Sequence, residues 1–162
     1  MTVTTHIDDP LLADAVDLSW KPIDTAVGYE ISVDGSSATI KLSDAFMRFG
    51  TVTSGPHTYK VRAYDKDGKF SGWSNTVSAI VSLTEPEVTA TGGQNTITAT
   101  WKPVPGATGY EVLLDRVTTP AIKVTGTTYT FSGLKAKEFY TFGVTATAPG
   151  IRSFGAGGAT TQ

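Results

Sequence analysis

Histidine is the side chain best suited to proton transfer near neutral pH, and this chain has two, His6 and His57. In a catalytic triad, a histidine activates a serine hydroxyl and is itself oriented by a carboxylate. Both histidines instead fall in or beside segments with strand-like alternation, and the sequence contains no Gly-x-Ser-x-Gly motif. We therefore predict that both are structural.

Glu30 and Glu111 are the candidates for the paired carboxylates that glycoside hydrolysis requires. Each follows a tyrosine within a Gly-Tyr-Glu tripeptide. In an alternating strand, the residue after a core tyrosine faces solvent, so neither glutamate is expected to be catalytic. Because no other reactive constellation occurs, we predict a protein that is not an enzyme and binds no cofactor.

Carboxylates gather at two places where calcium could bind. Asp65-Lys-Asp-Gly68 is like the start of a calcium loop, but no downstream glutamate supplies the closing bidentate ligand, so we predict a hairpin turn. Glu85 and Glu87 flank the junction between the two copies, where some tandem adhesion proteins bind calcium. Asp8 and Asp9 lie at a different distance along the chain from the one that such a site needs, so we expect no metal. The absence of cysteine removes disulfides and thiolate zinc sites.

The segments that carry these residues occur twice. Two motifs are repeated at one constant spacing: Trp20-Lys-Pro22 and Gly28-Tyr-Glu30 return as Trp101-Lys-Pro103 and Gly109-Tyr-Glu111. Such self-similarity indicates two copies of one folding unit. We predict two tandem domains, residues 1–83 and 84–162, which meet at Leu83-Thr-Glu-Pro86.

The composition predicts an all-β chain. Seventeen glycines and eight prolines punctuate short runs in which apolar and polar residues alternate, and no segment has helical periodicity. Seven short strands in each copy, separated by turns, are typical of a β-sandwich. The last predicted strand of the first copy spans residues 70–81, and that of the second copy spans residues 151–160. We expect the latter to be weak because its glycines supply no side chain to pack.

These residues resemble the fibronectin type III family over nearly the whole chain, twice. The resemblance rests on one set of motifs: Leu18/Trp20 with Pro22, Gly28-Tyr29, their second-copy equivalents, and Gly133-Leu134, Tyr140 and Val144-Thr-Ala146. It implies two seven-stranded sandwiches, with Tyr140 as a tyrosine corner that bonds to upstream backbone. In the first copy His57 takes the corner position, or the corner is missing.

Aromatic residues near or in the last predicted strand of each copy are the candidates for partner contacts, namely Phe70, Trp73 and Phe154. Trp73 is not repeated in the second copy, where Phe154 is the nearest counterpart. Trp73 is either a packing residue of the fold or a contact for a protein partner or a sugar.

The charge and hydropathy of the chain argue against two classes of partner, nucleic acids and membranes. The formal charge is −2 and no basic stripe occurs, so nucleic acid is not an expected partner. No apolar run could span a bilayer, so we expect no membrane insertion. Residues 1–6 lack a signal-peptide pattern, so we expect the protein to be made in the cytoplasm and released by lysis.

The family hosts adhesion, spacing and receptor roles, so the resemblance implies a structural or interaction protein. The chain is similar to fibronectin type III domains in the head decoration and tail proteins of tailed phages. That similarity implies a virion location, docking on capsid or tail proteins, and weak binding to a cell-surface glycan. The alternative is an accessory spacer or binding module of an extracellular bacterial polysaccharide-degrading enzyme.

Overall fold

The computed structural model describes residues 2–6, 15–114 and 121–162. The chain forms two compact units, Met1–Val81 and Ser82–Gln162, and all regular elements in the described residues are strands. No helix that is long and apolar enough to cross a bilayer occurs in these described ranges. The all-β prediction is confirmed.

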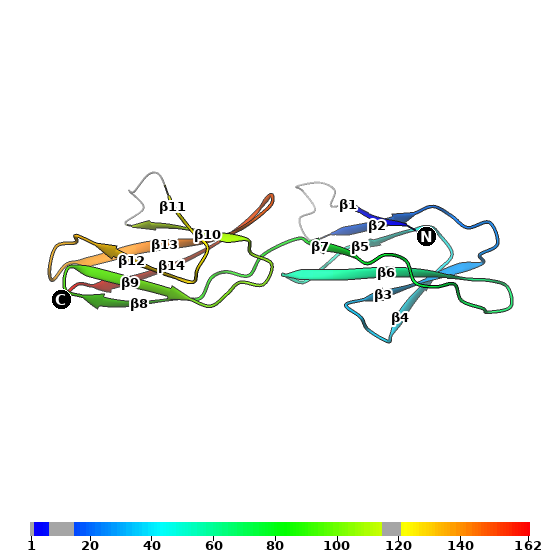
Figure 1. Ribbon diagram of the computed structural model, residues 1–162, viewed down its shortest axis with the longest axis horizontal. Helices are drawn as coiled ribbons and strands as arrows, with labels where there is room; N and C mark the ends of the chain where they lie inside the picture. Colours follow the sequence, from blue (N-terminus) through cyan, green and yellow to red (C-terminus); the bar gives the residue numbers. More distant parts are fainter. Residues whose placement is uncertain (1, 7–14, 115–120) are drawn as a thin grey trace. The chain divides into compact units, whose positions relative to one another are not determined.

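Unit 1 is built from two antiparallel sheets (Figure 1). The three-stranded sheet has the order β1 (Val3–His6), β2 (Val16–Trp20), β5 (Phe46–Phe49). The four-stranded sheet has the order β4 (Thr39–Leu42), β3 (Gly28–Val33), β6 (Pro56–Tyr64), β7 (Val77–Ile80).

Unit 2 repeats this plan. Its three-stranded sheet has the order β12 (Thr128–Ser132), β9 (Thr96–Trp101), β8 (Val88–Gly93). Its four-stranded sheet has the order β11 (Ile122–Val124), β10 (Gly109–Leu114), β13 (Phe139–Ala148), β14 (Ile151–Thr160). The predicted sandwich is confirmed, because strand alternation gives each unit an apolar layer between its two sheets.

The repeated tryptophan and tyrosine form the centre of each core. Trp20 meets Tyr29 edge to face with ring centroids 5.2 Å apart, and Trp101 meets Tyr110 in the same way at 5.3 Å. The Tyr29 hydroxyl accepts a hydrogen bond from the Ile23 amide at 2.9 Å, which fixes the loop between β2 and β3. Tyr110 makes the same bond to the residue six positions earlier, at 2.8 Å. The repeated motifs therefore serve the fold.

The predicted strand over residues 70–81 is shorter than expected. Only Val77–Ile80 form β7, although the preceding segment also lies beside β6. There, Ser71 and Ser74 interrupt the ladder: their hydroxyls accept the amides of Ala63 and Val61, each at 3.0 Å. Side-chain oxygens thus replace the backbone carbonyls of a regular strand, which the alternation of residue types does not reveal.

The expectation of a weak last strand is wrong. β14 pairs with β13 at ten consecutive positions, from Phe139 opposite Thr160 to Ala148 opposite Ile151. Its glycines serve close packing: a methyl group on Gly155 would overlap the carbonyl oxygen of Pro86, at the start of the same unit. The strand is held within its own unit because glycine lets backbone approach backbone.

Candidate functional site

The two glutamates are engaged in ion pairs within separate units. Glu30 is only 3% exposed and accepts two hydrogen bonds from Arg62, at 3.0 and 2.7 Å, with Lys41 3.7 Å away. Glu111 pairs with Arg152. Each carboxylate lies on the outward side of its own four-stranded sheet, with a cation from a neighbouring strand beside it. The expectation that Glu30 faces solvent is wrong, because Arg62 and its neighbours cover the carboxylate.

His57 occupies the corner position of unit 1. Its Nε2 donates to the carbonyl oxygen of Thr53 at 3.0 Å, and its Nδ1 lies 2.7 Å from Asp34 Oδ2. The hydrogen bond to Asp34 raises the pKa of His57, against an opposing effect of burial. Burial acts to raise the pKa of Asp34, but hydrogen bonds from Thr58 and His57 together lower it.

The remaining predicted chemical residues lie apart from one another. His6 is in β1, with its backbone opposite Asp17. Asp65 closes a turn, because its Oδ1 accepts the amides of Asp67 and Lys69 at 3.0 and 2.9 Å, as the hairpin prediction required. Glu87 pairs with Lys102 at 2.6 Å on the surface.

Asp8 and Asp9 lie outside the described residues. Across the part of the chain that is described, no three His, Asp or Glu side chains are grouped so that they could hold a metal ion.

Phe70 and Trp73 belong to a stack on the outward face of unit 1. The Arg62 guanidinium lies 3.8 Å from the centre of the Phe70 ring and 4.6 Å from that of Trp73. Lys60 Nζ also lies over the Trp73 ring, 5.1 Å from its centre. We call these four residues the cation–aromatic stack. Because Arg62 also bonds Glu30, the stack covers the buried carboxylate.

Phe154 lies in unit 2 beside an aromatic residue that the sequence analysis did not single out. Phe139 is 65% exposed and Phe154 is 46% exposed, and they stand on the paired strands β13 and β14. The Phe154 ring lies against Gly143 and the Phe139 ring against Gly158. A hollow of about 350 Å³ lies along these residues. We call this surface the phenylalanine platform.

Phe139 could have been recognised from the alternation of β13. Tyr140, Phe142 and Val144 occupy alternate positions and share one face of the strand, so the residue before Tyr140 must point to the other. A large aromatic residue on the outward face is the signal that was available.

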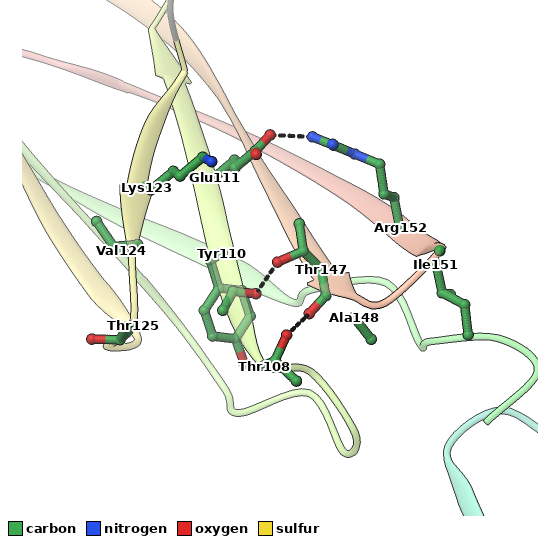
Figure 2. Close-up of a pocket in the computed structure, with 12 residues that line it drawn as sticks. Thr108, Tyr110, Glu111, Lys123, Val124, Thr125, Thr147, Ala148, Ile151 and Arg152 are labelled. Atoms are coloured by element: carbon green, nitrogen blue, oxygen red, sulfur yellow. Dashed lines mark hydrogen bonds and ion pairs between the residues drawn. The ribbon is translucent and has the colours of Figure 1, made fainter. Parts of the chain in front are cut away.

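A second hollow, of about 520 Å³, lies further along the same sheet face. Figure 2 shows Glu111 joined to Arg152, with Lys123 on the other side of Glu111. Thr147 supports the floor, since its hydroxyl donates to the carbonyl of Gly109 at 3.0 Å. We call this hollow the polar groove.

The polar groove and the phenylalanine platform are continuous across one row of the sheet. Glu111 on β10 is opposite Thr145 on β13, and Thr145 is opposite Phe154 on β14. The outward face of this sheet therefore offers hydrogen-bonding groups at one end and exposed aromatic rings at the other, an arrangement suited to binding a ligand.

The comparisons with known proteins agree with this fold. Residues 81–155 match the family model described as Fibronectin type III domain. Unit 2 therefore contains a fibronectin type III domain, and unit 1 has the same order of strands in its two sheets.

Chitinase A1 of Niallia circulans is 33% identical over 159 aligned residues, which cover 83% of this chain and 21% of that protein. The chain thus spans about a fifth of the length of this relative.

Two solved structures are similar to this chain at low sequence identity. The central fibronectin-III array of RIM-binding protein has 20% identity and a TM-score of 0.39, and the match covers 99% of this chain and 60% of that one. The structure described as FN3tt mut has 24% identity and a TM-score of 0.41, and covers 48% of this chain and 94% of its own.

Proposed function

We propose that this chain is a non-catalytic accessory module of an extracellular enzyme that degrades an insoluble polysaccharide, with chitin as the first candidate. The observation that carries the proposal is the 33% identity to part of a chitinase, spread over 83% of this chain. An alignment that covers both units but a fifth of the relative is what a shared accessory region would produce.

The chemistry of the described side chains supports a non-catalytic role. Glu30 is sealed beneath Arg62, and His57 is bonded to the backbone of a corner. Glu111 is paired with Arg152 and lies in a different unit from Glu30, so the two do not form the carboxylate pair of a glycosidase within either unit. Binding surfaces remain, above all the outward face of unit 2.

A phage virion role receives no comparable support. The relative reported above is described as a chitinase and not as a virion protein. One reason for expecting capsid or tail partners was a last strand in need of external support, and β14 is fully paired with β13. The partners that we propose are the catalytic domain of the same enzyme and its polysaccharide, with a location outside the cell.

The proposal is tested by fusing the complete chain to a chitinase catalytic domain. Hydrolysis of insoluble chitin and of a soluble chitin oligosaccharide is then compared for the fusion, the catalytic domain alone, and an unlinked mixture of the two proteins. We expect the fusion to be faster on insoluble chitin only, because a tethered module raises the local concentration of catalyst at the surface. Equal rates for the fusion and the mixture on insoluble chitin would overturn the proposal.

A further inference from the structure

We propose that the phenylalanine platform of unit 2, formed by Phe139 and Phe154 with the glycine floor between them, binds a neutral β-linked polysaccharide chain such as chitin. This inference rests on the proposed function and assigns the contact to particular residues. It concerns one face of one unit and requires no contribution from unit 1.

The exposure of the two rings is the first argument. Both phenylalanines leave about half or more of their surface in solvent, and each lies on the outward side of its strand. Phe142 and Val144, on the same strand as Phe139, are 2% and 0% exposed. The two exposed rings therefore do not belong to the hydrophobic core. Exposed aromatic residues are typical anchors of binding surfaces.

The floor of the platform is the second argument. Gly143 and Gly158 lie beneath the rings, and a methyl group on either would overlap the ring of Phe154 or Phe139. Gly143 pairs with Ala156, so Gly143 and Gly158 are diagonal neighbours on the two strands, about 7–8 Å apart. The rings thus reach toward each other over glycines and the small side chains of Thr141 and Ala156, and the hollow between them suits an extended polymer.

The chemistry of the lining is the third argument. The residues around the platform are phenylalanine, glycine, alanine and threonine, none of which ionises, so the surface favours a neutral ligand. A sugar ring presents an apolar face of C–H groups and an equatorial rim of hydroxyls. The rings match the apolar face, while Glu111 and Thr145 in the same row as Phe154, and Arg152 paired with Glu111, can bond the hydroxyls.

A structural role for the rings makes a different prediction. An aromatic ring that lies over a cross-strand glycine stabilises the sheet, and its loss would lower stability without affecting ligand binding. A ring that binds a sugar loses affinity on truncation while the unit remains folded. The two roles are separated by measuring adsorption and folding on the same variants.

The experiment measures adsorption of the complete chain to insoluble chitin by depletion from solution. Phe139→Ala, Phe154→Ala and the double variant are compared with the natural chain, and Phe46→Ala is the matched control. Phe46 is 49% exposed on β5 of unit 1, close to the exposure of Phe154, but lies outside the platform. Amide NMR spectra check that each variant is folded.

We expect each platform variant to reduce the association constant about five- to tenfold, and Phe46→Ala to leave it unchanged. A Phe154→Trp variant should retain or increase adsorption, because a larger ring offers more stacking surface. Equal adsorption by the folded double variant and the natural chain would overturn the inference, as would failure of the natural chain to adsorb. Equal loss in Phe46→Ala would also overturn it.

These outcomes are separable from those of the fusion test. If the fusion accelerates hydrolysis of insoluble chitin but the double variant adsorbs normally, the accessory role stands and the platform is not its contact. If the double variant loses adsorption while the fusion gives no acceleration, the platform binds sugar but the proposed function fails.

Discussion

Glu30 and Glu111 occupy the same place in the two units, yet their surroundings differ. Opposite Glu30, β6 supplies Arg62, whose guanidinium bonds the carboxylate and lies against two aromatic rings. Opposite Glu111, β13 supplies Thr145, and the cation comes instead from Arg152 on β14. Unit 1 therefore covers its carboxylate, whereas unit 2 leaves the polar groove open beside it.

The comparison shows how one sandwich can be closed or open on its outer face. The change from arginine to threonine at one strand position removes the central layer of the cation–aromatic stack. The regular β14 then lies flat beside β13 and carries Phe154, where unit 1 has the serine-linked segment of Phe70 and Trp73. The proposed binding surface is thus on the unit that lacks the stack.

The largest expected difference between the two faces is the response to loss of arginine. Arg62→Ala leaves Glu30 buried with only Lys41 nearby, so it should lower the stability of unit 1 by about 3 kcal/mol. Arg152→Ala should cost unit 2 less than about 1 kcal/mol, since the Arg152 side chain is 60% exposed. Hydrogen exchange of the β3 and β10 amides measures both. Equal losses of stability in the two variants would show that the arginine is no more important on the closed face of unit 1 than on the open face of unit 2.

A somewhat smaller effect is expected from the glycines of β14. Gly155→Ala forces a methyl group into the carbonyl of Pro86 and should destabilise unit 2 by about 2 kcal/mol. Gly126→Ala is the control, because nothing lies within 4 Å of the added carbon there. Thermal unfolding of both variants provides the measurement. A neutral Gly155→Ala would show that the flat strand does not depend on this close approach.

Aromatic residues of the two faces should respond in opposite ways. Trp73→Ala removes the ring that Arg62 and Lys60 lie over. It should lower the free energy of unfolding of unit 1 by about 1 kcal/mol without changing adsorption to chitin. Phe154→Ala should reduce adsorption with little change in unfolding midpoint. If Trp73→Ala abolished adsorption in a folded protein, Trp73 would be a ligand contact and the stack a second binding surface.

The smallest expected effect concerns pH at the two corners. Because His57 has a raised pKa, its stabilising bond is fully present below the usual value of 6.5 and is lost as pH rises through the raised value. Asp34 has a lowered pKa, so its contribution is present above 3.8 and is lost as pH falls through the lowered value. In unit 2 the corner is Tyr140, whose hydroxyl accepts the Lys135 amide at 3.0 Å.

Unfolding midpoints of the natural chain and of His57→Tyr between pH 5 and pH 9 test this difference. We expect the natural unit 1 to lose less than about 1 kcal/mol above the raised pKa, since the carboxylate is partly exposed, and the variant to lose this dependence. An identical pH profile for both proteins would show that the His57–Asp34 pair contributes nothing measurable.

Much of the fold was predictable from local pattern. Alternation assigned Trp20 and Tyr29 to the core, and their repetition at Trp101 and Tyr110 predicted a second unit of the same kind. The pattern failed at the segment from Phe70 to Asn75 and at β14. In both, spacing along the chain says nothing about which backbone groups a serine hydroxyl or a glycine will meet across the sheet.

The sequence by itself determined two sandwiches with equivalent cores, because apolar alternation and turn residues act locally and recur in each copy. Only the tertiary structure decided which outward face is closed. That outcome depends on pairs that are distant in the chain, such as Glu30 with Arg62 and Gly143 with the Phe154 ring, which strand register brings together. Phe154 was recognised as a candidate contact, but its neighbour Phe139 and the glycine floor between them emerged only once β13 and β14 were paired.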